Sequence, residues 1–355
     1  MNKKNTKKLP VKPRQAVVPL ESQFAEVAEL VRIGRRRAFA SVNAAVIETY
    51  WQVGRYISGK VEKASWGQGV VQQLAEYLQK TILDPRGFSA RNLWRMKQFH
   101  DIYGSYEKLS ALLTQLSWTN HLLILSKSRS KEERLFYLSL SAKERYSSRE
   151  LERQLNSGLF ERSVLSKPKL STLLTVLHPK AESVFRDSYS LDFLGLPDGH
   201  SETDLRKAIV RSLKNFIIEF GRDFAFMGEE HRVQVGMKDF FLDLLFYHRE
   251  LRCLIAFELK IDEFKPEYLG KLSFYLEALD RDVKKPHENP SIGIILCKGK
   301  DDEVVEYALS RTLSPAAIAD YTTKLPDKRL LEEKLHEFFD SSVRELQAEY
   351  EGKTG

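Results

Sequence analysis

The chain has little of what a disulfide-bonded, zinc-binding or membrane-spanning protein needs. Its 355 residues include two cysteines, Cys253 and Cys297, with no Cys-x-x-Cys pair and no histidine at ligand spacing. Both lie in apolar, strand-like runs, which predicts buried, reduced thiols and a cytoplasmic location. No apolar run approaches the roughly 18 residues of a transmembrane helix, so we expect no membrane partner. No apolar segment follows the basic N-terminus, and we predict a disordered tail over residues 1–20 instead of a signal peptide.

Charge is distributed unevenly between the two halves of the chain. Residues 1–180 hold 31 Lys and Arg against 15 Asp and Glu, whereas residues 181–355 hold 25 against 34. A basic excess of this kind is typical of proteins that neutralise the phosphates of a nucleic acid. An ordinary solvated surface, or a surface for protein partners, would give the same count.

A helical pattern dominates residues 21–170, which we predict to be a helical DNA-binding domain. Within it, "DPRGFSARNLWRMKQFHDIY" is typical of a turn followed by a helix, with Ser89 placed as the N-cap. One side of that helix is apolar and another side is basic or polar. The two sets are Leu93, Met96, His100 and Tyr103, and Arg91, Arg95 and Gln98. The second set would suit a recognition helix in a DNA groove, although a solvated basic face has the same pattern. Lys127 and Arg129 are further candidates for phosphate contact.

The second half of the chain mixes strands with helices. A helix over residues 201–220, with Ser201 as its N-cap, precedes the strand-like runs "HRVQVG", "DFFLDLLFYH" and "RCLIAFELK". The short link between the last two runs predicts a hairpin. A helix from Pro266, the buried strand "SIGIILCKG" and another helix follow. We therefore predict an α/β fold with a mixed sheet over residues 201–350, preceded by a linker over residues 171–200.

Three charged residues fall inside the two strands of the predicted hairpin. Side chains alternate along a strand, so Glu258 and Lys260 share one face, and Asp243 lies in the neighbouring strand. A buried ion pair between Lys260 and one carboxylate would leave the other carboxylate without a partner. Two adjacent carboxylates are instead typical ligands of Mg²⁺. Beside such an ion Lys260 could orient or deprotonate a water, or offset charge on a phosphate.

This arrangement resembles the PD-(D/E)XK nuclease superfamily. Asp243 is separated by fourteen residues from Glu258-Leu259-Lys260, within the order helix, three strands, helix, strand. Leu242 stands where the superfamily's name-giving proline would be. "FFLDLLFYHRELRCLIAFELKIDEFKPEYLGKLSFYLEALD" looks like the nuclease domain of the bacterial YhcG-type family. "GFSARNLWRMKQF" and "LSWTNHLLIL" look like that family's helical, winged-helix-like N-terminal domain, and the resemblance covers about residues 25 to 345.

The resemblance implies a metal-dependent nuclease that hydrolyses phosphodiester bonds. Asp243 and Glu258 would hold Mg²⁺, for which Mn²⁺ can substitute, together with the carbonyl of Leu259. Lys260 would be the catalytic lysine. DNA is the expected partner, with RNA as a second candidate, and many enzymes of this superfamily act as homodimers. The alternative is a DNA-binding or assembly protein that retains the nuclease fold without catalysis.

Two helical residues complete the expected site. Glu219 matches the helical acid that contacts the metal or its waters in the superfamily, although an exposed helix-end glutamate would have the same position. Lys271 matches a helical residue that reaches the scissile phosphate. A lysine whose stem covers apolar neighbours would have the same spacing.

Overall fold

The computed structural model describes residues 20–63, 66–83, 85–104 and 110–337. By its internal contacts the chain divides into two compact units, Met1–Ser117 and Trp118–Gly355. Each unit is described by itself. The predicted tail over residues 1–20 lies outside the described residues, except that the first helix begins at Leu20.

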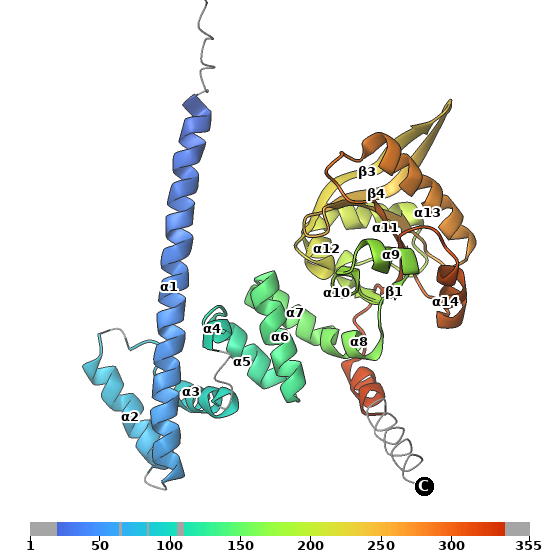
Figure 1. Ribbon diagram of the computed structural model, residues 1–355. Coiled ribbons are helices and arrows are strands. Elements are labelled where there is room, and N and C mark those ends of the chain that lie inside the picture. The colour runs from blue at the N-terminus through green and yellow to red at the C-terminus, as the bar shows by residue number, and fades with distance from the viewer. Residues whose placement is uncertain (1–19, 64–65, 84, 105–109, 338–355) are drawn as a thin grey trace, which may run out of the picture. The chain divides into compact units, whose positions relative to one another are not determined.

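The first unit contains four helices in its described residues. They are α1 (Leu20–Glu62), α2 (Gln68–Thr81), α3 (Ala90–Tyr103) and α4 (Ser110–Leu113). Figure 1 shows α3 packed across the C-terminal half of α1. The two helices approach closely at Gly54, because a Cβ there would lie 2.1 Å from the Met96 carbonyl oxygen. Ile47 and Ile57 of α1 are buried in this contact region.

Helix α3 begins and packs as its sequence predicts. The Ser89 hydroxyl accepts a hydrogen bond from the Asn92 amide at 3.3 Å, which confirms the N-cap. Leu93, Met96 and Tyr103 are buried, as expected for the apolar side of the helix. No strand occurs in the described residues between 20 and 168, so these residues form helices and contain no wing.

The second unit begins with four helices and continues into a mixed sheet. The helices are α5 (Trp118–Lys127), α6 (Lys131–Glu144), α7 (Ser148–Asn156) and α8 (Leu159–Leu165). The strands are β1 (Lys169–Leu170), β2 (Ser188–Ser190), β3 (Phe224–Val235), β4 (Lys238–His248), β5 (Cys253–Leu259), β6 (Ile292–Cys297) and β7 (Ala316–Thr322). Their order is β1-β7-β6-β5-β4-β3, with β2 also paired to β7. The hairpin between β4 and β5 is antiparallel as predicted, whereas β5, β6 and β7 are parallel neighbours.

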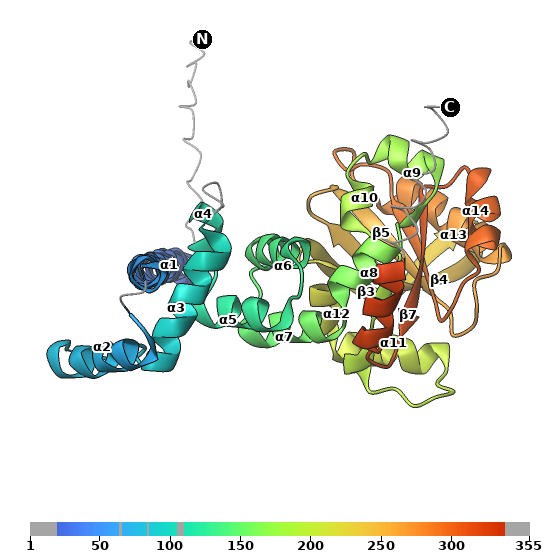
Figure 2. The ribbon, with the colours of Figure 1, turned by 90° about the horizontal axis from the view of Figure 1, so that it is seen from below.

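Helices cover both faces of this sheet. One core lies between the sheet and α9 (Thr172–Leu177), α10 (Ala181–Val184), α11 (Glu202–Arg211) and α12 (Leu213–Phe220). The other lies between the sheet and α13 (Glu267–Ala278) with α14 (Asp302–Ser310), as Figure 2 shows. The predicted α/β class with a mixed sheet is therefore confirmed. Cys253 and Cys297 are buried free thiols in these strands, also as predicted, and burial raises the pKa of both to about 12.

Three features differ from the sequence-based expectations. The single helix predicted over residues 201–220 is two helices, because the chain leaves helical geometry at Ser212 (φ −107°, ψ 28°). Residues 171–200, expected to be a linker, form α9, α10 and β2, and Leu174, Phe185 and Tyr189 are buried in the core. Strand β7 was not anticipated. None of the helices in the described ranges is long and apolar enough to cross a bilayer.

Candidate active site

The β4–β5 pairing brings Asp243 and Glu258 together. Leu244 lies opposite Phe257 in the register, which places Asp243 next to Glu258 across the two strands. The backbone N–H of Leu259 donates to Asp243 Oδ2 at 2.8 Å, so the end of β5 fixes the orientation of this carboxylate. The sequence analysis predicted that these two acids converge because it predicted the hairpin. The observed register of the hairpin places the two carboxylates side by side.

Glu258 is the most enclosed group of the site, with 1% of its side chain exposed. Its Oε1 atom lies 3.0 Å from Lys260 Nζ and 2.6 Å from Lys271 Nζ. Its Oε2 atom is buried and has no hydrogen-bond partner among the described residues. A buried carboxylate oxygen without a partner is costly, and a bound cation would supply what is missing.

Lys260 lies at the centre of the cluster. It directly follows the last residue of β5, and its N–H donates to the Leu296 carbonyl of β6 at 2.9 Å, which fixes the backbone. Its ammonium group donates to the Leu259 carbonyl at 3.0 Å and to Glu202 Oε1 at 3.0 Å. Atoms of the expected Glu258-Leu259-Lys260 motif therefore meet at the C-terminal end of β5, an interior strand of the sheet.

Helix α11 adds two residues that the sequence reasoning did not select. Glu202 contacts Lys260, and Arg206 Nη1 lies 3.5 Å from Asp243 Oδ1. Arg206 also donates to Glu230 Oε1 at 2.8 Å. The sequence reasoning used Ser201 as the N-cap of this helix and did not consider Glu202, the residue that follows it. The spacing of Glu202 and Arg206, one helical turn apart on one face, was the signal that could have identified them.

The charges in the site shift each other's ionisation. Burial and the nearby Glu258 raise the pKa of Asp243, although the Leu259 N–H opposes this. Burial lowers the pKa of Lys260, but the carboxylates of Glu258 and Glu202 outweigh it and raise the pKa overall. The pKa of Lys271 is raised in the same way by Glu258. Both ammonium groups are thus held in the charged form by the acids they contact.

Glu219 lies in a different cluster. It is fully buried on α12, where Oε2 accepts hydrogen bonds from Arg153 and Gln154, both at 3.1 Å. Oε1 accepts from the Ser190 amide at 2.9 Å and lies 3.4 Å from Arg162 Nη2. Burial alone would raise its pKa, but the surrounding arginines lower the pKa to about 2. The carboxylate is therefore charged at neutral pH and is the partner of buried guanidinium groups.

This position does not match either expectation for Glu219. The carboxylate is buried, so it is not an exposed helix-end residue. Its partners among the described residues are arginines and amides of its own cluster, and none belongs to the Asp243–Glu258 site. The helical acid that does reach the catalytic lysine candidate is Glu202, one helix earlier.

The candidate nucleic-acid residues fall into two separate units. Arg91 and Gln98 are exposed on α3 of the first unit, and Arg95 is partly exposed. Lys127 and Arg129 belong to the second unit, where both already have acidic partners. Lys127 donates to Glu152 at 2.8 Å, and Arg129 lies 2.5 Å from Glu332.

The donor set suits a hard divalent cation. No group of three or more His, Cys, Asp and Glu side chains with metal-binding geometry occurs in the part of the chain that the structure describes. Two carboxylates with a backbone carbonyl are nevertheless typical of Mg²⁺, which usually keeps several waters and takes phosphate oxygens as further ligands. The unpartnered Oε2 of Glu258 beside Asp243 fits this type of site.

The fold and the motif define a PD-(D/E)XK nuclease domain. Residues 182–336 match the family model described as the YhcG PDDEXK nuclease domain, and residues 26–162 match the DUF1016 N-terminal domain. Over 346 residues the chain is 30% identical to the protein called "Putative nuclease YhcG" of Escherichia coli (strain K12), covering 87% of this chain and 92% of that protein. The chain belongs to the YhcG family.

Two solved structures match part of the chain. One is a repair endonuclease from Pyrococcus abyssi, with 14% identity, a TM-score of 0.25 and coverage of 37% of this chain and 50% of that one. The other is a complex of EndoMS with double-stranded DNA, with 18% identity, a TM-score of 0.23 and coverage of 34% and 49%. The chain thus matches about half the length of each, and the family assignment rests on the sequence matches.

Proposed function

We propose that this protein is a Mg²⁺-dependent nuclease that hydrolyses phosphodiester bonds of DNA. The observation that carries the proposal is the buried, unpartnered Oε2 of Glu258 beside the Asp243 carboxylate. Membership of a family described by its nuclease domain supports the same reaction class. Mn²⁺ is the expected substitute ion, because it accepts the same oxygen ligands.

Each residue of the site has a role that its contacts support. Asp243, Glu258 and the Leu259 carbonyl would hold the cation, which supplies a Lewis acid for a phosphate oxygen and a water. Lys260, charged and held between Glu258 and Glu202, would donate hydrogen bonds to a water or to a phosphate oxygen. Lys271 leaves half of its side chain exposed and would reach the phosphate from α13.

Nucleic-acid binding is assigned to the exposed side of α3. Arg91, Arg95 and Gln98 have no acidic partner within the described part of the chain. A helix face with one exposed and one partly exposed guanidinium group suits a phosphate backbone. Lys127 and Arg129 are weaker candidates because carboxylates already neutralise them. DNA is the proposed partner, and RNA is the competing substrate in the test.

The test compares metal binding and cleavage in matched variants. Purified protein is incubated with single-stranded, duplex and branched DNA and with RNA, with Mg²⁺ or Mn²⁺, and Mn²⁺ binding is measured separately by calorimetry. Glu258→Gln should lose metal binding and at least about 100-fold in cleavage rate, and Lys260→Ala should lose cleavage while retaining metal. Glu277→Gln, an exposed glutamate of α13, is the control and should keep both. Equal activity in all proteins would refute the assignment.

A catalytically silent DNA-binding protein is the second candidate. It is favoured by the ion pairs of Glu258 with two lysines and of Asp243 with Arg206, which already balance the charges of the cluster. This candidate predicts that wild-type protein binds DNA but neither binds Mn²⁺ at this site nor cleaves any substrate. Metal binding that depends on Glu258 would exclude it.

A further inference from the structure

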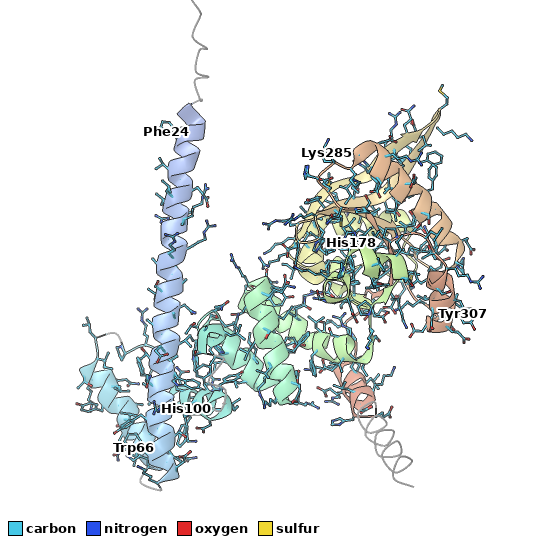
Figure 3. All side chains as sticks on the ribbon, viewed as in Figure 1. Phe24, Trp66, His100, His178, Lys285 and Tyr307 are labelled. Carbon is cyan, nitrogen blue, oxygen red and sulfur yellow. The ribbon has the colours of Figure 1, made fainter. Side chains whose placement is uncertain are left out.

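Helix α11 places the guanidinium group of Arg206 among three carboxylates. The arginine side chain is 12% exposed, and its Nη2 atom donates to Glu230 Oε1 at 2.8 Å. Asp243 Oδ1 lies 3.5 Å from Nη1, and Glu229 Oε2 lies 4.0 Å from Nε. All three acids belong to the β3–β4 hairpin, and Figure 3 shows the side chains along both of its strands. One cation therefore faces three anions beside the candidate active site.

The contact of Arg206 with Asp243 differs from its contact with Glu230. At 2.8 Å the Glu230 contact is a charge-assisted hydrogen bond, which holds the guanidinium group in place. At 3.5 Å the Asp243 contact is longer than a typical hydrogen bond, so it contributes charge and little orientation. Asp243 takes its orientation from the Leu259 N–H, which donates to Oδ2 at 2.8 Å. Arg206 thus acts on Asp243 mainly as a counter-ion.

This counter-ion lies at an oxygen that a divalent cation would use. The Leu259 N–H contacts Oδ2 of Asp243, so Oδ1 is the less occupied oxygen of that carboxylate. On Glu258 both lysines contact Oε1, and Oε2 has no partner among the described residues. A positive charge next to a metal-binding carboxylate lowers its affinity for a cation, because like charges repel strongly where water is partly excluded. Arg206 and a divalent cation therefore compete for Asp243.

The guanidinium group also keeps an unused capacity to bind an anion. Its Nε–H is buried and has no hydrogen-bond acceptor in the part of the chain that the structure describes. A buried donor without an acceptor is costly, so this position of Arg206 is not fully satisfied. Arginine presents its N–H groups in one plane, which suits the oxygens of a phosphate. A phosphodiester bound at Asp243 and Glu258 would bring such oxygens next to Arg206.

We propose that Arg206 couples metal binding to substrate binding. Its guanidinium group competes with a divalent cation for Asp243 and, when displaced from Asp243, contacts a phosphate of the nucleic acid. The phosphate contact rests on the proposed function, whereas the competition at Asp243 does not. The alternative is a purely structural tie between α11 and the β3–β4 hairpin. That alternative predicts that loss of Arg206 weakens metal binding, because the hairpin that carries Asp243 would lose support.

The first experiment measures Mn²⁺ affinity by calorimetry in the absence of nucleic acid. Arg206→Gln and Arg206→Met both remove the positive charge and should bind Mn²⁺ at least about 5-fold more tightly than wild type. Arg206→Lys keeps the charge and should bind within about 2-fold of wild type. Arg211→Gln removes an exposed arginine at the end of the same helix and, as the control, should leave the affinity unchanged.

Thermal unfolding checks that each variant is folded at the assay temperature. Weaker or unchanged Mn²⁺ binding by the folded, uncharged variants of Arg206 would overturn the competition and favour the structural tie. An equal gain of affinity in Arg206→Lys would also overturn it, because the gain would then not come from the lost charge.

The second experiment measures the affinity for fluorescent single-stranded and duplex DNA by anisotropy, with Mn²⁺ and with EDTA. All proteins carry Lys260→Ala, so that cleavage does not consume the DNA. Adding Arg206→Gln should lower the affinity at least about 3-fold with Mn²⁺, because a phosphate contact is lost. It should leave the affinity unchanged with EDTA, where Arg206 pairs with Asp243.

The comparison of the two conditions decides the phosphate contact. A loss of the same size with Mn²⁺ and with EDTA would reflect net charge alone and would overturn the contact, as would no loss in either. If no protein binds DNA, both the phosphate contact and the proposed function are contradicted, whereas the calorimetry still decides the competition at Asp243. Neither experiment depends on nuclease activity.

Discussion

Replacing Glu219 with glutamine separates a structural role from a catalytic one. The carboxylate is fully buried and lies within 3.4 Å of guanidinium nitrogens of Arg153 and Arg162. Glutamine has nearly the same shape but no charge, and its amide group presents donors to donors. Two arginines on α7 and α8 would then be left partly unpaired against α12.

The size of the effect follows from this burial. Removing one partner of a buried ion pair costs about 3–5 kcal/mol. For a unit of this size, 1 kcal/mol shifts the unfolding midpoint by about 2–4 °C, so we expect Glu219→Gln to unfold roughly 10 °C below wild type. The lowered pKa leads to a similar figure, because a folded-state value of about 2 against 4.5 corresponds to roughly 3 kcal/mol. A lowered pKa means that this stability is present above about pH 4.5 and is lost as the pH falls towards 2.

Thermal unfolding and cleavage are measured on the same samples. Wild type, Glu219→Gln and the exposed control Glu277→Gln are unfolded at neutral pH and at pH 3, and cleavage is assayed well below every unfolding midpoint. We expect the stability difference between wild type and Glu219→Gln to shrink at pH 3, and the folded variant to cleave at a wild-type rate. An unchanged midpoint together with lost cleavage would refute the structural assignment and restore Glu219 to the active site.

Two further substitutions test how local structure supports the two units. Gly54→Val would place side-chain atoms against the Met96 carbonyl and should destabilise the α1–α3 contact by about 1–3 kcal/mol. The free energy of unfolding is measured by chemical unfolding of the full chain. Gly59→Val is the control, because the space around Gly59 is open. Ser201→Ala removes the capping box that begins α11 and should cost about 1 kcal/mol. Because Glu202 follows the cap, cleavage should fall with it, whereas loss of stability with full cleavage would show that Glu202 does not need this support.

The central pair of the site was predictable because strand geometry leaves few choices. Alternation places Glu258 and Lys260 on one face, and the four-residue turn after β4 fixes which residue of the hairpin lies beside Glu258. When the connection between two strands is short, the positions of residues in the sequence therefore determine which of them are neighbours across the strands. The same reasoning found the Ser89 and Ser201 caps, because a cap depends only on residues within the next turn.

The helical acid was not predictable in this way. Glu202 and Glu219 both lie before the first long strand, and the resemblance to the superfamily favoured the later one. The break at Ser212 separates α11 from α12, so that Glu202 meets Lys260 while Glu219 meets arginines that lie about 60 residues earlier. Contacts across such long separations depend on how helices pack, which periodicity does not encode. Strands β1 and β2 were missed for a related reason, since two or three residues carry no alternation pattern.

The Glu219 cluster also bears on where nucleic-acid binding is assigned. The N-terminal family model extends to residue 162, yet α7 and α8 are tied by Arg153 and Arg162 to the core of the second unit. Residues 118–165 are thus part of the second unit, and four of their cations contact carboxylates, namely Lys127, Arg129, Arg153 and Arg162. Residues 1–117 contain 19 Lys and Arg against 9 Asp and Glu, so most of the basic excess lies in the unit that contains α3. If the basic charge of the first unit determines DNA affinity, replacing Arg91 and Arg95 should lower the affinity and its dependence on salt concentration. Replacing Lys127 and Arg129 should change neither.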